Sequence, residues 1–175
     1  MLINLFSILS QDGKEQKLQV AFESDYFRDK RNQYKIVEKS PMEILLKNKG
    51  DKVIELTGGM KLEMMVACAR CLELVKVPFD IEFDYELDMK QTDEERMENL
   101  DEVNFLTGLD IDTEKLAYNE ILLNWPIRVL CKEDCQGICS RCGVNLNKVT
   151  CECDTHELDP RMAAISDIFS KFKEV

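Results

Sequence analysis

Eight cysteines are the residues of this 175-residue chain whose type and spacing best suit a chemical role. Six of them lie in the stretch "CKEDCQGICSRCGVNLNKVTCEC", and two form an upstream "CARC" pair. Cysteines spaced as C-x-x-C are typical zinc ligands, because zinc takes four thiolates in a tetrahedron. Since eight thiolates divide into two sets of four, the count predicts two structural zinc ions. The predicted ligands are Cys68, Cys71, Cys131 and Cys135 for one ion, and Cys139, Cys142, Cys151 and Cys153 for the other.

Other interpretations of the cysteines stay open on the sequence alone. Cys135 could exchange with Cys139 between the two sites. His156, the one histidine of the chain, lies close enough to Cys153 to replace a thiolate. A C-x-x-C pair also serves disulfide exchange in redox proteins. A zinc-thiolate redox protein or a zinc-responsive regulator is therefore the alternative function.

Catalysis by such a metal is not expected. One histidine is too few for the histidine-rich ligand sets of zinc hydrolases, and a site closed by four thiolates leaves no position for a catalytic water. The sequence also has no phosphate-binding glycine loop and no G-x-S-x-G motif. We expect a protein that is not an enzyme, and we infer no small-molecule substrate.

The compartment follows from what the chain does not contain. Its first 30 residues do not resemble a signal peptide, and no run of 18 apolar residues predicts a membrane span. We therefore expect a cytoplasmic protein with no membrane partner. A reducing cytoplasm disfavours four structural disulfides, which strengthens the metal interpretation of the cysteines.

The net charge of −11 is concentrated in one stretch. Residues 88–120 carry 3 basic and 11 acidic side chains, whereas residues 1–87 sum to −2 and residues 121–175 to −1. Such a stretch is typical of a solvated connector. The whole chain lacks the basic footprint of most nucleic-acid-binding proteins, which argues against strong direct binding to RNA.

Alternation of apolar and polar residues predicts strands in the first half. The clearest is 75–87, and Pro78 predicts that it lies at a sheet edge or carries a bulge, because proline cannot donate to a ladder. "NKGD" and "TGG" are predicted turns. Further strands are expected at 2–9, 17–22, 34–39, 41–48, 52–57 and 62–66.

Helices are expected in the second half. One begins after Asp112 or Thr113 and ends before Pro126. Another begins near Pro160 and places Met162, Ile165, Phe169 and Phe172 on one face. The predicted class is α+β, with an antiparallel sheet or partial barrel followed by helices and a cysteine-rich zinc-knuckle segment. Residues 1–175 are expected to form a single domain: mainly strands over 1–87, an acidic connector over 88–112, and helix, cysteine-rich segment and C-terminal helix over 113–175.

Several separated motifs together resemble one family. The segment "CARCLELVKVP", the later "CSRCGVNLN" and the "DPR" near the end resemble the bacterial YceD family of large ribosomal RNA subunit accumulation proteins, over roughly residues 60–170. The resemblance implies a cytoplasmic factor needed for 23S ribosomal RNA to accumulate, and so a role in ribosome biogenesis. It implies ribosomal RNA precursor, a basic ribosomal protein or an assembly factor as partner, and the acidity of the chain favours a protein-mediated contact.

Overall fold

The computed structural model describes residues 1–92, 95 and 103–153. The chain divides into two compact units. Unit 1 consists of Met1–Ala67 and Leu74–Val129, and unit 2 of Cys68–Glu73 and Leu130–Val175. The expectation of one domain over residues 1–175 stays a prediction.

A six-stranded antiparallel sheet forms most of unit 1, and its long central strand is β6 (Val53–Ala67). Strand β7 (Leu74–Asp88) pairs with β6 along its whole length. The opposite edge of β6 is shared by two shorter strands, β5 (Met42–Gly50) and β4 (Gln33–Lys39). Among the described strands β7 pairs only with β6, so the predicted edge position of the strand that carries Pro78 is confirmed.

Each half of the sheet has one further strand. Strand β2 (Glu15–Val20) pairs with β5, and β3 (Tyr26–Arg28) pairs with β4 in a hairpin. Alternate residues of these strands are buried, as Phe79, Ile81 and Phe83 are on β7. Because side chains alternate between the two faces of a strand, this pattern gives the sheet one apolar face.

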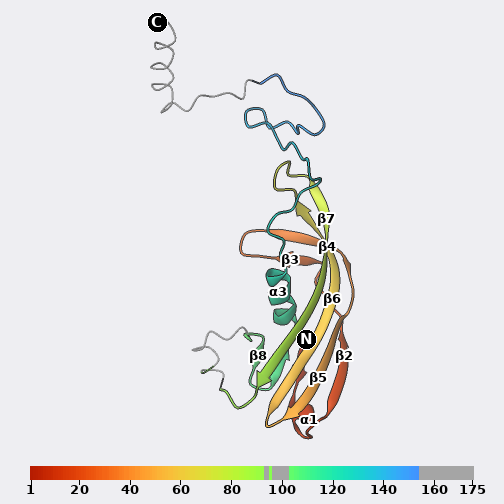
Figure 1. The fold of residues 1–175 in the computed structure, drawn as a ribbon, viewed down its shortest axis with the longest axis vertical. Helices are drawn as coiled ribbons and strands as arrows, with labels where there is room; N and C mark the ends of the chain where they lie inside the picture. Colours follow the sequence, from red (N-terminus) through yellow and green to blue (C-terminus); the bar gives the residue numbers. More distant parts are fainter. Residues whose placement is uncertain (93–94, 96–102, 154–175) are drawn as a thin grey trace, which may run out of the picture. The chain divides into compact units, whose positions relative to one another are not determined.

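A second layer covers the apolar face of the sheet. It contains helix α1 (Phe6–Leu9), helix α3 (Thr113–Leu123) and a three-stranded sheet in the order β1-β9-β8. Figure 1 shows α3 and β8 along one side of the long strands. The bounds of the three short strands are β1 (Leu2–Asn4), β8 (Leu106–Thr107) and β9 (Asp110–Asp112).

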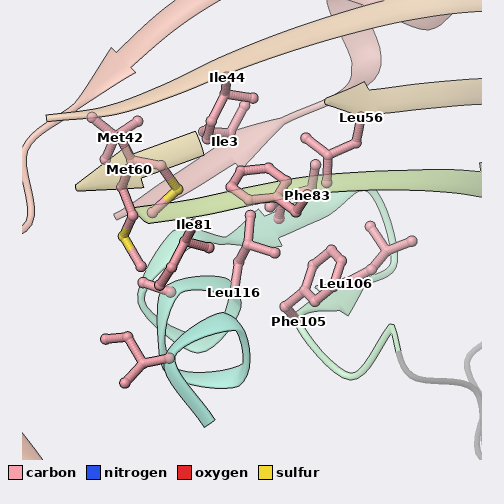
Figure 2. Close-up of a cluster of buried hydrophobic side chains, with 14 of the residues drawn as sticks. Ile3, Met42, Ile44, Leu56, Met60, Ile81, Phe83, Phe105, Leu106 and Leu116 are labelled. Carbon is pink, nitrogen blue, oxygen red and sulfur yellow. The ribbon is translucent and has the colours of Figure 1, made fainter. Parts of the chain in front are cut away.

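The core of unit 1 lies between the two layers. Figure 2 shows Leu116 of α3 and Phe105 facing the sheet residues Ile81 and Phe83. Both Leu116 and Phe105 are fully buried. The packing of helix and loop against one sheet face therefore holds unit 1 together, since burial of apolar area is the main stabilising term in folding.

Helix α3 begins where the sequence predicts. The side chain of Asp112 accepts hydrogen bonds from the backbone N–H groups of Glu114 and Lys115, which satisfies two of the unpaired donors at the helix start. Ala117 and Ile121 face the core and are fully buried. The helix ends at Leu123, shortly before Pro126, as the residue before a proline disfavours helical geometry.

One turn prediction and one strand prediction need correction. The "TGG" segment is not a turn but the middle of β6, because Gly58 lies beneath the ring of Phe83 and any side chain there would meet the carbonyl of Glu43. The strand expected over 2–9 ends at Asn4 and is followed by α1, whose Ile8 is buried with Leu5 at helical spacing.

Two further predictions concern the acidic connector and the C-terminal helix. The acidic stretch 88–112 contains β8 and β9 in addition to connector residues. The predicted C-terminal helix near Pro160 lies outside the described residues. Over residues 1–92 and 103–153, the structure is mostly antiparallel sheet with few helices. Within the described residues, no helix combines the length and apolar character that crossing a membrane would need.

Candidate metal centres

All eight cysteines belong to unit 2, where their sulfurs form two groups of four. In each group the sulfur atoms lie within 4.8 Å of one another. The grouping is the division that the spacing predicts, and Cys135 and Cys139 fall in different groups. We call these the first cysteine set (Cys68, Cys71, Cys131 and Cys135) and the second cysteine set (Cys139, Cys142, Cys151 and Cys153).

The first cysteine set has the dimensions of a tetrahedral site. The Sγ atoms of Cys68 and Cys135 are 3.8 Å apart, and those of Cys71 and Cys131 are 3.5 Å apart. Four sulfurs at the zinc–thiolate distance of about 2.3 Å from one ion would be about 3.8 Å from each other. These thiols are free rather than joined in disulfides, so their sulfurs can all turn to one ion.

The loop between β6 and β7 positions the first C-x-x-C pair by a tight turn. The N–H of Cys68 donates to the carbonyl of Glu73 at 2.8 Å, and the N–H of Leu72 donates back to the carbonyl of Cys68 at 3.0 Å. Leu72 has a φ of 62°, in the left-handed region. The turn brings the backbone N–H of Cys71 toward the sulfur of Cys68, and the two sulfurs belong to one set of four within 4.8 Å of one another.

The second C-x-x-C pair has the same backbone pattern. The N–H of Cys139 donates to the carbonyl of Val144, and the N–H of Gly143 donates to the carbonyl of Cys139, both at 2.9 Å. Gly143 has a φ of 73° at the position that Leu72 occupies in the first turn. The two turns therefore have the same hydrogen-bond pattern, and each contributes two sulfurs to a different set.

Proton affinities within each set are spread widely. The backbone N–H of Cys71 is the main cause that lowers the pKa of Cys68 to about 6, whereas burial and neighbouring thiols raise the pKa of Cys131 to about 12. In the second set, the N–H of Cys142 lowers the pKa of Cys139 to about 6, and the Cys142 side chain and burial raise that of Cys153 to about 12. Four sulfurs this close cannot all ionise unless a cation compensates their charge.

Polar groups around Cys135 hold it in place. The side-chain amide of Asn147 donates to the Cys135 sulfur at 3.3 Å, and its oxygen accepts the N–H of Gln136 at 2.9 Å. The guanidinium of Arg70 donates to the Cys135 carbonyl at 2.7 Å. Second-layer contacts of this kind orient metal ligands. Sequence reasoning missed Asn147, although it is the last residue of the quoted "CSRCGVNLN" segment.

An ion pair borders the first set. The ammonium of Lys148 contacts the carboxylate of Glu73, which directly follows the first C-x-x-C turn. That contact lowers the pKa of Glu73 and raises the pKa of Lys148. His156, the alternative ligand, lies outside the described residues.

Comparison with known proteins shows which family matches the part of the chain that contains the cysteines. A family model described as "Large ribosomal RNA subunit accumulation protein YceD" matches residues 56–169, a range that contains both cysteine sets. The chain belongs to the YceD family. The resemblance stated from the sequence motifs is thereby confirmed, and the family is named for a role in the accumulation of large-subunit ribosomal RNA.

Individual relatives support the same family. The chain is 29% identical over 65 residues to the chloroplastic YCED homolog 1 of Arabidopsis thaliana, covering 37% of this chain and 20% of that protein. It is 30% identical over 116 residues to an uncharacterized protein of Mycobacterium tuberculosis, covering 65% and 54%. It is 28% identical over 113 residues to YlbN of Bacillus subtilis, covering 64% of each. The aligned part spans less than two thirds of each relative, and no solved structure matches.

Proposed function

We propose that this protein is a non-enzymatic factor that supports the accumulation of large-subunit (23S) ribosomal RNA in the cytoplasm. The family match over residues 56–169 carries the proposal, because it includes both cysteine sets and bears that description. The partner is ribosomal RNA precursor, a basic ribosomal protein or another assembly factor.

Two zinc ions with a structural role form the second part of the proposal. The sulfur groups have the spacing and donor type that a tetrahedral thiolate ion needs. Such an ion would hold Cys68–Glu73 to residues 131–135, two segments that lie far apart in the sequence. Binding free energies of about 10–16 kcal/mol in small zinc modules are large enough to order a segment that contains few apolar residues.

Elemental analysis of protein purified without chelators tests the metal sites. We expect close to two zinc ions per chain. Four-thiolate sites also suit iron, so iron is measured in the same sample. One ion per chain would contradict the division into two sets, and a carefully reduced preparation without metal would remove the metal proposal.

Ribosomal RNA levels test the biological role. In a bacterial strain from which the gene is deleted, we expect less mature 23S RNA relative to 16S RNA, restored by a plasmid copy of the wild-type chain. A copy carrying Cys71→Ser should restore it poorly if the first metal site is needed for the fold. Unchanged 23S RNA in the deletion strain would overturn the proposed role.

The alternative function, a redox or zinc-responsive regulator, makes a different prediction for the metal. A regulator releases zinc reversibly under mild oxidant as its thiolates form disulfides. A structural site retains the ion under the same treatment. Zinc release measured with a chromophoric indicator during mild peroxide treatment therefore separates the two functions.

A further inference from the structure

The β3–β4 hairpin carries a concentration of positive charge in an acidic protein. Residues 26–35 contain four basic side chains and one acidic side chain, which gives a net charge of +3 where the whole chain has −11. All four cations are exposed: Arg28, Lys30, Arg31 and Lys35. We call residues 26–35 the cationic hairpin.

None of these four cations has an ion-pair partner among the described residues. By contrast, seven lysines elsewhere in unit 1 do form ion pairs within the same ranges. These are Lys39, Lys47, Lys49, Lys61, Lys76, Lys90 and Lys115. Because many lysines of unit 1 are neutralised by such pairs, the hairpin stands out as a segment where four cations, unpaired in the part of the chain that the structure describes, gather and can contact an external anion.

The strand register places the hairpin side chains in a row with residues of β6 and β7. Tyr26 lies opposite Lys35, Lys35 opposite Met65, and Met65 opposite Lys76. Directly paired residues of antiparallel strands point to the same face, so these four side chains form a row. Arg28, two residues after Tyr26, lies on that face as well.

An exposed aromatic ring stands within the row. Tyr26 is 44% exposed, whereas the adjacent Phe27, on the opposite face, is 3% exposed. The ring lies at the end of the row, beside Lys35 across the ladder and Arg28 along the strand. Proteins that bind single-stranded nucleic acids use exposed rings next to cations, since bases stack on the ring while phosphates contact the cations.

The hairpin is held rigidly in this position. Its tip is fixed by Asp29, whose carboxylate accepts the backbone N–H groups of Arg31 and Asn32, both at 2.6 Å. These bonds lower the pKa of Asp29. Beneath the row, the ring of Phe27 stacks on Trp125 at 5.7 Å between ring centres. Little ordering is therefore needed before a ligand binds.

We propose that the cationic hairpin, including Tyr26, is a binding surface for single-stranded RNA. The proposal rests on the proposed function and names its partner as RNA itself. Residues 88–120 account for most of the net negative charge. Where they meet the hairpin, through the rings of Tyr118 and Phe27, they lie on the face opposite to the row. A basic ribosomal protein would be repelled by this surface.

Fluorescence anisotropy with a labelled 12-nucleotide single-stranded RNA tests the surface on the full-length, metal-loaded chain. Neutralising four phosphates on a single strand gives a slope of log affinity against log salt of about −3. The variant Arg28→Ala/Lys35→Ala should reduce that slope to about −1.4. The ratio of wild-type to variant affinity should therefore be about 25 times larger at 0.1 M salt than at 1 M salt.

A second variant tests the aromatic part of the surface. Tyr26→Ala should weaken binding about fivefold or more, because base–aromatic stacking contributes at least about 1 kcal/mol per base. Tyr26→Phe should bind like the wild type, since the ring is kept. A duplex of the same sequence should bind more weakly than the single strand, because its bases are stacked on each other.

The control variant removes two lysines that already have partners. Lys47→Ala/Lys61→Ala changes the net charge of the chain as much as the hairpin double variant does, and it removes the pairs with Glu15 and Asp80. It should leave the RNA affinity and the salt slope unchanged, and thermal melts should show that all variants fold.

Two results would overturn the inference. They are the absence of RNA binding by the wild type, and equal losses of affinity in the hairpin and control variants. The proposed function is tested separately by 23S RNA levels. If the deletion strain loses 23S RNA but the purified hairpin variant binds RNA as tightly as the wild type does, the surface is rejected and the proposed function stands.

Discussion

Leu72 and Gly143 occupy the same backbone position in the two cysteine turns. Substitutions at these two residues show how much a left-handed backbone conformation contributes to zinc retention. Both have left-handed φ values, 62° and 73°. A Cβ added at Gly143 meets no atom within 4 Å, so Gly143→Ala changes backbone freedom and nothing else. We expect it to weaken zinc retention at the second cysteine set about fivefold, since an alanine in this conformation costs about 1 kcal/mol. Competition with a zinc chelator measures the loss.

The reciprocal variant serves as the control. Leu72 is largely exposed, so Leu72→Gly removes little packing and relieves the strained conformation. Its zinc retention at the first set should equal or exceed that of the wild type. A weakening as large as that of Gly143→Ala would show that the leucine side chain, and not the backbone, matters at this position.

Local C-x-x-C spacing and simple counting led to the same grouping of the eight cysteines as the structure, although the exchange of Cys135 with Cys139 could not be decided from the sequence. It did not predict the contact of Asn147 with the sulfur of Cys135. That contact depends on how residues 144–147 fold back, through bonds such as the one from the Leu146 N–H to the Gly137 carbonyl. Such long-range hydrogen bonds leave no periodic signal in the sequence.

At the scale of elements, Gly58 permits β5, β6 and β7 to lie as close as they do. A Cβ at Gly58 would lie 2.2 Å from the carbonyl oxygen of Glu43 and 2.7 Å from the Phe83 ring. Gly58→Ala must therefore shift the β5 backbone, and we expect a loss of about 1–3 kcal/mol in the free energy of unfolding, the usual range for overpacking. Urea denaturation followed by circular dichroism measures it.

A companion substitution shows which contact dominates. Phe83→Leu makes room beside the ring but leaves the Glu43 carbonyl in place, so the double variant Gly58→Ala/Phe83→Leu should not regain the lost stability. Thr57→Ala, on the outward face of β6, should change stability by less than about 0.5 kcal/mol. Full recovery in the double variant would contradict the proposed backbone clash.

Elements with a strong local signal were predictable, and those that depend on tertiary contacts were not. The alternation over 75–87 and the Asp112 cap both led to the correct element. The glycine pair in β6 suggested a turn because glycine is common there, yet its role is close approach of neighbouring strands. Strands β8 and β9 have two and three residues, too few for a pattern to emerge from an acidic stretch.

At the scale of the whole molecule, the surface charge depends on which side chains form ion pairs, and not on the net charge of a sequence segment. Residues 1–87 sum to −2 and look neutral, but most lysines of the sheet are paired and those of the cationic hairpin are not. The average over a segment therefore conceals a positive surface. The metal sites add a second dependence on charge, because thiols must lose protons before they bind a cation.

Metal binding to the whole chain should accordingly weaken as the pH falls. In the metal-free protein, neighbouring thiols and burial raise the pKa of Cys131 and Cys153 to about 12, and also raise those of Cys71 and Cys151. Near neutral pH these four thiols are protonated, so each ion that binds displaces at least two protons. Zinc affinity should then fall about 100-fold per pH unit below neutrality, because each displaced proton contributes a factor of ten. Chelator competition at several pH values measures this slope, and the Cys151→Ser variant separates the first set from the second. An affinity that stays constant across the same range would mean that the sulfurs are ionised before the metal arrives.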